Sequence, residues 1–118
     1  MTVSVDLYPS AVDGERRFSG LERLYGQEPA RSIRSAHVAV IGIGGVGSWA
    51  AEALARSGIA ELTLVDMDHV SESNINRQLH ALTDTVGQSK IEAMAKRIGQ
   101  INPACKLHLV DDFVTQDN

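Results

Sequence analysis

Runs and stripes of apolar residues divide most of this chain into short segments. Residues 37–41, HVAVI, form a continuous apolar run, which is typical of a strand covered on both faces in a parallel sheet. Ser48–Ser57 is rich in alanine and stops at Gly58, which predicts a helix. A second apolar run, ELTLVD, ends at Asp66. The three segments therefore predict one strand–helix–strand unit.

The same pattern then continues toward the C-terminus. Residues 69–87 are rich in Ser, Asn, Thr and His and are expected to form a loop. A helix is predicted over residues 88–101, because apolar side chains recur on one face: Ile91, Met94, Ala95, Ile98 and Ile101. KLHLVDDF predicts a third strand. We therefore predict an α/β fold with a Rossmann-like parallel sheet, the first half of a doubly wound sheet with strand order 3-2-1.

The N-terminal third has a different character. Within residues 1–34, ERRFSGLERLYG places apolar residues at helical spacing, and we expect one or two short helices with Gly26 and Pro29 as breakers. The predicted organisation is an N-terminal helical arm over 1–34, followed by the α/β unit over 35–118.

Composition narrows the class of protein. The chain has 118 residues, 43% hydrophobic and 22% charged, with a net charge of −4, as expected of one small globular domain. No basic stripe is present, so the segment by itself is a poor candidate for nucleic-acid binding. The single cysteine, Cys105, excludes a disulfide framework and a zinc knuckle, and we expect a buried, inert thiol. Nothing resembles a membrane span or a signal peptide, which predicts no membrane contact and a cytoplasmic location.

A glycine-rich loop carries the candidate chemistry. Gly42, Gly44, Gly45 and Gly47 lie between the first strand and its helix. Gly42 is expected to permit the turn, Gly44 and Gly45 to let a phosphate approach the backbone, and Gly47 to let the helix pack closely on the strand. The helix N-terminus attracts an anion. Asp66 ends the second strand, where an acid accepts hydrogen bonds from ribose, so we predict a nucleotide site.

The downstream residues favour ATP over a redox dinucleotide. The loop after the second strand holds Asn74, Asn76, Arg77 and Gln78, and Lys90 begins the next helix. Loops at the carboxyl ends of parallel strands converge on the ligand, so Arg77 and Lys90 are placed to neutralise a triphosphate. The alternative is that Arg77 pairs with a nearby carboxylate and Lys90 is a solvated helix residue.

Four motifs occur together and in order: GIGGVGS, LVDMD, SNINRQ and VGQSK. They resemble the ATP-binding half of the adenylating enzymes related to ubiquitin-activating enzyme, which include activators of sulfur-carrier proteins in thiamine and molybdopterin synthesis. The resemblance covers residues 17–112. Within it, RFSGLERLYG, NINRQLHAL and INPACKLHLVDDFVT are most similar to the tRNA threonylcarbamoyladenosine dehydratases. Those enzymes use ATP to activate the carboxylate of N6-threonylcarbamoyladenosine at position 37 of tRNA, and the side chain cyclises as AMP is lost.

The resemblance implies a role for each matched residue. The loop around Gly44 and Gly45 faces the α-phosphate, Asp66 holds the ribose, and Asn74, Arg77 and Lys90 contact phosphates. Arg77 and Lys90 are the predicted catalytic residues. The full predicted nucleotide-binding set is Gly42, Gly44, Gly45, Gly47, Asp66, Asp68, Ser73, Asn74, Asn76, Arg77, Gln78 and Lys90.

The resemblance also implies what these residues do not supply. We expect residues 35–118 to be the ATP-binding half of a domain truncated at its C-terminus. The family's Mg²⁺-binding carboxylate is expected beyond residue 118, and no metal ligand is predicted here. Many relatives carry an N-terminal arginine that reaches the partner subunit's ATP, where this chain has Gly20. A homodimer, tRNA as substrate of the full-length protein and a cysteine-desulfurase system are the implied partners.

Two other functions stay open at this point. The first is adenylation of the C-terminus of a ubiquitin-like sulfur-carrier protein, and the second is an NAD-dependent oxidoreductase. We also expect Trp49 to pack against the sheet or a partner subunit rather than on adenine. The strand at residues 37–41 is expected to have a bare edge, which favours self-association of the isolated segment.

Overall fold

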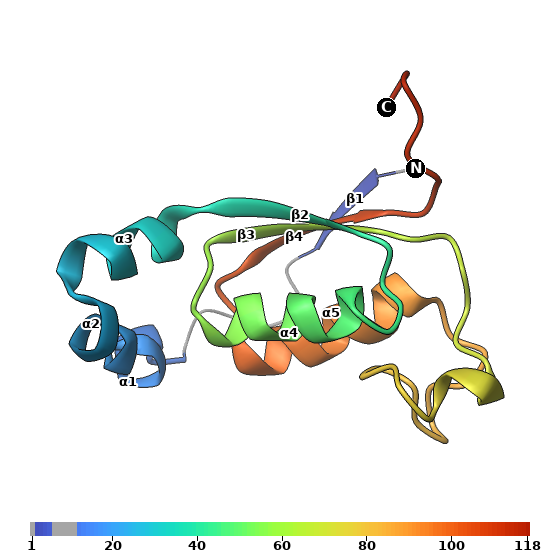
Figure 1. Cartoon of the computed structure of the whole chain (residues 1–118), viewed down its shortest axis with the longest axis horizontal. Helices are drawn as coiled ribbons and strands as arrows, with labels where there is room; N and C mark the ends of the chain where they lie inside the picture. Colours follow the sequence, from blue (N-terminus) through green and yellow to red (C-terminus); the bar gives the residue numbers. More distant parts are fainter. Residues whose placement is uncertain (1, 6–11) are drawn as a thin grey trace.

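The computed structural model describes residues 2–5 and 12–118, and it contains one sheet with helices packed against it (Figure 1). The strands are β1 (Thr2–Val5), β2 (His37–Ile41), β3 (Glu61–Val65) and β4 (Lys106–Val110). The helices are α1 (Gly14–Phe18), α2 (Gly20–Tyr25), α3 (Gln27–Ser35), α4 (Gly47–Arg56) and α5 (Lys90–Ile101), with a short 3₁₀ turn, η1, at Glu72–Asn74. No helix among the described residues is long and apolar enough to cross a membrane.

The predicted parallel sheet is confirmed. Strands β2 and β3 pair in parallel, as do β3 and β4, and the sheet order is β1-β4-β3-β2. The three predicted strands therefore lie in the order 3-2-1. Strand β1 was not predicted, and it pairs antiparallel with β4, with Thr2 opposite Val110. Four residues are too few to show a clear alternation of apolar and polar positions. The strand is recognised only by its pairing with the free edge of β4.

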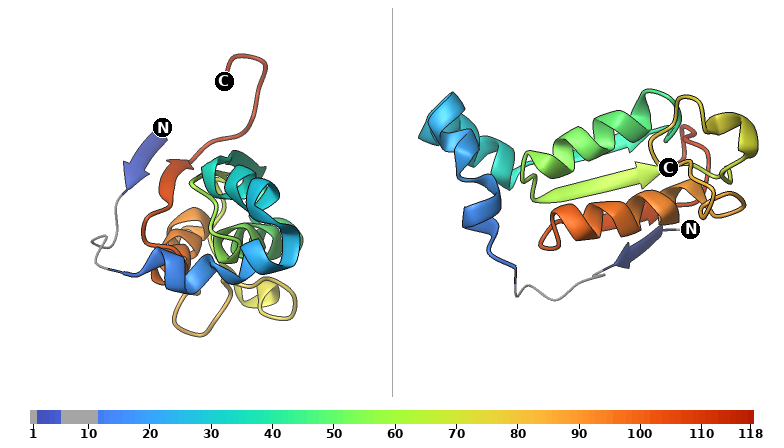
Figure 2. Two further views of the ribbon diagram at one scale, coloured as in Figure 1. Left: turned by 90° about the vertical axis from the view of Figure 1, so that its left-hand side faces the viewer. Right: turned by 90° about the horizontal axis from the view of Figure 1, so that it is seen from below.

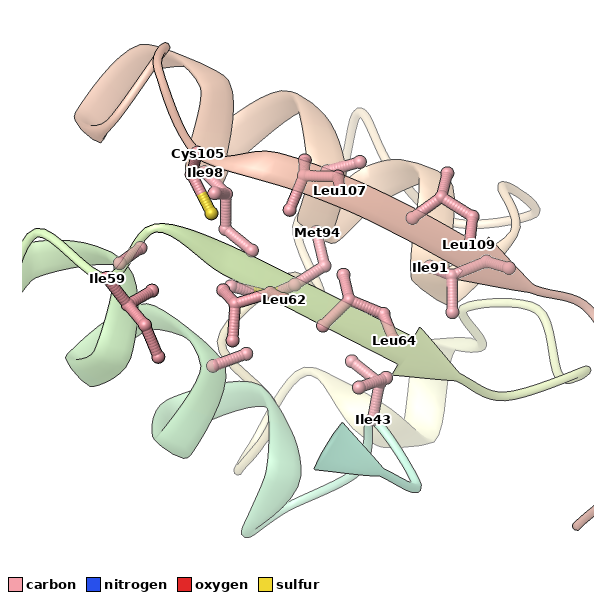
Figure 3. Close-up of a cluster of buried hydrophobic side chains, with 13 residues drawn as sticks. Ile43, Ile59, Leu62, Leu64, Ile91, Met94, Ile98, Cys105, Leu107 and Leu109 are labelled. Atoms are coloured by element: carbon pink, nitrogen blue, oxygen red, sulfur yellow. The ribbon is translucent and has the colours of Figure 1, made fainter. Parts of the chain in front are cut away.

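One face of the sheet holds the core. Helices α4 and α5 lie side by side beneath it (Figures 1 and 2), and leucines on alternate positions of β3 and β4 point between them (Figure 3). Leu62 and Leu64 are fully buried, and Met94 and Ile98 of α5 meet them from the helix side. The apolar face predicted for α5 is thus confirmed, although the helix begins at Lys90 rather than at residue 88.

No helix among the described residues covers the opposite face of the sheet (Figure 1), which corrects one expectation. Residues of β2 alternate between exposed and half-buried, so HVAVI is covered on one face rather than two. Ile41 remains 63% exposed at the end of this strand. Strand β2 also forms an edge of the sheet among the described residues, as predicted.

The N-terminal helices pack at the end of the sheet where α4 ends (Figure 2). Gly58 adopts φ +75°, and a Cβ there would lie 2.7 Å from Arg34 Cδ and 2.8 Å from Phe18 Cγ. Close contact with the helical arm therefore requires glycine at this turn. Gly26 separates α2 from α3 as predicted, but Pro29 lies inside the first turn of α3 and does not break it. The first helical turn tolerates proline because its N–H groups have no intrahelical acceptor.

Candidate nucleotide site

The glycine loop joins β2 to α4 at the carboxyl end of the sheet. Gly42 has φ +87° and its N–H donates to the carbonyl of Val65, so the strand pairing continues into the turn. A Cβ on Gly47 would lie 1.7 Å from the carbonyl oxygen of Gly42. Only glycine permits this approach of helix to strand, which is the role predicted for Gly47. Gly42 and Gly47 thus shape the loop, and the positive end of α4 points toward any ligand above it.

Two residues of the following loop lie against the glycine loop. A Cβ built on Gly45 would contact the side chain of Arg77 at 3.7 Å, and one on Gly44 would lie 3.8 Å from Gln78 Nε2. Gln78 is buried, and its Oε1 has no hydrogen-bond partner among the residues described. A buried polar atom without a partner costs free energy. Gln78 therefore presents unsatisfied hydrogen-bonding capacity beside the glycine loop.

Arg77 is held in place by neutral oxygens. Its Nη1 donates to the carbonyl of Ser73 and to Asn76 Oδ1, both at 3.0 Å. No ion pair between Arg77 and a carboxylate occurs in the described part of the chain. The alternative that Arg77 pairs with a local acid is therefore not what the structure contains.

Lys90 lies at the N-terminus of α5 and is only 7% exposed. Its backbone N–H donates to the carbonyl of Asp68, which links the helix to the end of β3. Within residues 2–5 and 12–118, no carboxylate forms an ion pair with its ammonium group. Burying a charge without a partner is unfavourable, so this lysine is arranged to meet an anion. It is not the solvated helix residue of the alternative reading.

Asp66 closes β3 with both carboxylate oxygens engaged. Oδ2 accepts from the N–H of Ile43 at 2.7 Å, and Oδ1 accepts from the N–H of Asp68 at 2.8 Å. Each carboxylate oxygen retains further acceptor capacity for a hydroxyl group. Asp66 and Asp68 line a cavity of about 210 Å³ together with Gly42 and Phe113. Asp66 thus both fixes the glycine loop and faces a space at the carboxyl edge of the sheet.

The remaining predicted residues support the loop. Asn74 is buried and its Oδ1 accepts from the N–H of Ser71, which caps the turn η1. Ser73 contributes its carbonyl to Arg77, and its hydroxyl lies 3.1 Å from that of Ser71. Asn76 is exposed beside Arg77. The structure therefore gathers the predicted residues at one edge, whereas their individual contacts with a nucleotide stay predictions.

Two buried residues of the site were missed from the sequence. Ser48 donates to the carbonyl of Gly44 at 2.5 Å and accepts from the N–H of Leu79, joining the two loops. His80 Nε2 donates to the carbonyl of Ile43 at 2.7 Å, so its Nδ1 carries the lone pair. Burial lowers the pKa of His80, and the positive charge of Lys90 adds to this effect. A serine one residue into the helix and a polar residue in a loop carry no distinctive sequence signal.

Two smaller expectations concern Trp49 and Cys105. Trp49 is 54% exposed and donates from Nε1 to the carbonyl of Arg77, so it packs against the loop and not against the sheet. Cys105 is buried in the core as predicted. Burial raises the pKa of its thiol to about 11, with a contribution from Glu61, which keeps the thiol protonated and unreactive.

Three parallel strands with a glycine loop after the first and an acid after the second are the arrangement typical of nucleotide-binding α/β proteins, and Arg77 and Lys90 form no ion pair there among the described residues. Comparison with known families is more specific. The sequence profile of the ThiF family matches residues 18–118, and the chain therefore belongs to this family.

Relatives with assigned functions are similar over most of the chain. It is 60% identical over 103 residues to tRNA threonylcarbamoyladenosine dehydratase of Escherichia coli, covering 87% of this chain and 38% of that protein. The dehydratase of Bacillus subtilis is 50% identical over 101 residues, covering 86% of this chain and 40% of the relative. The crystal structure of the E. coli enzyme in complex with ATP superposes with a TM-score of 0.85 over 88% of this chain and 43% of that one. The chain thus spans about two-fifths of the length of these relatives.

Proposed function

We propose that the full-length protein uses ATP to activate the carboxylate of N6-threonylcarbamoyladenosine at position 37 of tRNA, and then cyclises the side chain. The observation that carries this proposal is that Arg77 lies against the glycine loop and Lys90 is buried at the N-terminus of α5, while neither forms an ion pair with a carboxylate among the described residues. The identity to the dehydratases and the ATP complex of the E. coli enzyme support the same assignment.

The proposed chemistry follows from where charge develops. A carboxylate oxygen of the substrate attacks the α-phosphorus of ATP, the bond to the β-phosphate oxygen breaks, and pyrophosphate leaves. Negative charge grows on the leaving group, where Lys90 and Arg77 would stabilise it. A nucleophilic atom of the same side chain then attacks the activated carboxyl carbon and displaces AMP. The AMP carries away the carboxylate oxygen that is lost in the dehydration.

In this proposal the ribose is held by Asp66, and the glycine loop carries the α-phosphate. The loop suits a phosphate because a Cβ on Gly45 would have the side chain of Arg77 as its nearest neighbour, from 3.7 Å outward, and α4 directs its positive end there. Gln78, with its unpartnered Oε1, is placed to bind the nucleotide or an ordered water. Ser48 and His80 would hold the loop rigid.

Further properties are proposed from the family resemblance alone. These are a Mg²⁺ ion held by a carboxylate outside these residues, a homodimer, a cysteine-desulfurase partner and a cytoplasmic location. We do not propose this role for Arg17, because its Nη1 donates to the carbonyls of Gln100 and Ile101 of the same chain, each at 2.9 Å.

Exchange of labelled pyrophosphate into ATP tests the function. We expect the full-length protein to catalyse exchange only with tRNA that carries threonylcarbamoyladenosine, and to release AMP as the product cyclises. The same tRNA lacking the threonylcarbamoyl group is the control. Exchange that responds to a ubiquitin-like carrier protein and ignores tRNA would instead establish the carrier-activating function. Stabilisation by NAD and not by ATP would contradict adenylation altogether.

A further inference from the structure

Three titratable side chains meet on the open face of the sheet, away from the nucleotide site. His37 begins β2, Glu61 begins β3 and His108 lies in β4. In the strand register His37 is opposite Glu61, and His108 is opposite Thr63, two residues along the same face. Strand β2 carries the chain from His37 to the glycine loop over about 13 Å, at roughly 3.3 Å per residue. The cluster is therefore separate from the proposed ATP site.

The ligand atoms of the three residues converge. His108 Nε2 lies 2.5 Å from Glu61 Oε2, and His37 Nδ1 lies 3.7 Å from the same oxygen. All three ligand atoms lie within 4.8 Å of one another. Among the described residues, this is the group of His, Cys, Asp and Glu side chains whose geometry suits a metal ion.

These distances are close to those of a tetrahedral metal centre. Two ligands bound at about 2.0–2.1 Å with tetrahedral angles are separated by about 3.3 Å. The two distances to Glu61 Oε2 lie on either side of this value, so small side-chain rotations place all three atoms around one ion. His37 is 48% exposed at its side chain, which leaves room for a water molecule as the fourth ligand.

A hydrogen bond orients one of the imidazoles. His37 Nε2 lies 2.7 Å from Thr63 Oγ1, a residue of the neighbouring strand. With Nε2 protonated and donating to Thr63, Nδ1 carries a lone pair on the side facing Glu61. Two imidazoles and one carboxylate form a ligand set that suits zinc and similar divalent transition metals.

We propose that His37, Glu61 and His108 form a binding site for a divalent transition-metal ion of the zinc class. The ion joins three adjacent strands on the face of the sheet opposite the helices, so its effect is on stability rather than on adenylation. This proposal does not depend on the proposed tRNA chemistry. It also differs from the zinc knuckle that the single cysteine excludes, because no thiolate takes part.

Titration of the chelator-stripped full-length protein with ZnCl₂ tests the site directly. We expect the wild type to bind zinc. His108→Asn and Glu61→Gln should each weaken zinc binding by roughly 100-fold or more, because each removes a direct ligand of the ion. Thr63→Val keeps the branched shape but removes the hydroxyl, and it should weaken zinc binding by about tenfold. Co²⁺ provides a second readout, through its tetrahedral absorption spectrum.

The matched control is His69→Asn, which removes an exposed histidine outside the cluster. This variant should bind zinc as the wild type does. Thermal unfolding with and without zinc checks that each variant folds, and zinc should raise the melting temperature of the wild type but not of His108→Asn. Equal zinc affinity and stoichiometry in wild type, His108→Asn and Glu61→Gln would overturn the proposal. The cluster would then be a hydrogen-bonded His–Glu–His group and nothing more.

Discussion

The two ends of the sheet use their positive charges differently. At the end where the N-terminal helices pack, Arg56 and Arg97 both bind the carboxylate of Glu52. There, too, Arg34 Nη1 lies 3.4 Å from Glu15 Oε1. At the carboxyl end, Arg77 and Lys90 have no carboxylate partner in the part of the chain that the structure describes. The carboxylates of Glu52 and Glu15 thus neutralise arginines where helices meet, whereas the two cations that we propose to bind ATP have no counter-charge among the described residues.

Each end also contains one glycine where a side chain collides. At Gly47 an added Cβ meets the backbone carbonyl of Gly42 at 1.7 Å, and at Gly58 it meets side chains of Arg34 and Phe18. A clash with backbone can be relieved only by moving a whole helix or strand, whereas a side chain can rotate away. We therefore expect an alanine at Gly47 to lower the free energy of unfolding more than an alanine at Gly58.

The largest effect is expected for Gly47→Ala. Because the methyl group must separate β2 from α4, the free energy of unfolding should fall by about 3 kcal/mol or more, together with loss of ATP binding. Gly58→Ala is the matched control at the other end. It should cost about 2 kcal/mol through its positive φ and leave ATP binding intact. Urea unfolding and nucleotide titration measure both, and a Gly47→Ala protein of wild-type stability would show that the close approach is dispensable.

Lys90→Ala should have the next largest effect, on catalysis. Removing one oriented cation should raise the adenylation barrier by about 3 kcal/mol, a fall in kcat of about 100-fold or more, because its interaction strengthens as charge develops. Affinity for ATP should change less. Lys96→Ala, on the exposed side of the same helix, is the control. Steady-state kinetics of pyrophosphate exchange decide the matter, and an unchanged kcat removes Lys90 from the mechanism.

A smaller effect is expected for Glu52→Gln, which leaves Arg56 and Arg97 without their carboxylate. Burial disfavours the charge of Glu52, but hydrogen bonds from Arg97 and Arg56 outweigh it and lower the pKa of Glu52 below 4.5. We expect a loss of about 1–2 kcal/mol at neutral pH, limited because both arginines are partly exposed. Catalysis should be retained.

The pH dependence of this variant follows from the sign of the shift. A carboxyl with a lowered folded-state pKa stabilises the protein above its unfolded-state value, near 4.5, and loses that contribution as the pH falls through the folded-state value. The stability difference between wild type and Glu52→Gln should therefore be full at neutral pH and shrink on acidification below pH 4.5. A difference that is constant with pH would mean that the ion pairs contribute nothing.

The smallest effect is expected for Arg17→Ala. This substitution removes two hydrogen bonds to the last carbonyls of α5, which should cost about 1 kcal/mol of stability and leave kcat unchanged. Lower kcat at unchanged stability would indicate instead that Arg17 reaches a partner subunit's ATP. Arg23→Ala, on an exposed position of the neighbouring helix, is the control.

Much of this molecule was predictable because its signals are local. The βαβ unit follows from apolar periodicity, and Gly42 and Gly47 follow from a turn that requires glycine. The placement of Arg77 and Lys90 at the carboxyl edge was predictable because loops at the carboxyl ends of parallel strands converge on one edge. Ser48 and His80 were not, because their importance lies in hydrogen bonds to loops distant in sequence.

The sequence by itself therefore determined the order and parallel direction of β2, β3 and β4 and the edge where the predicted nucleotide residues gather, since period and turn chemistry act over a few residues. Only the tertiary structure decided which charges are neutralised, because pairing of Glu52 with Arg97 depends on how α4 meets α5. It also decided that His37, Glu61 and His108 share one face. These residues lie far apart in sequence, and the parallel register of three strands brings their ligand atoms within 4.8 Å.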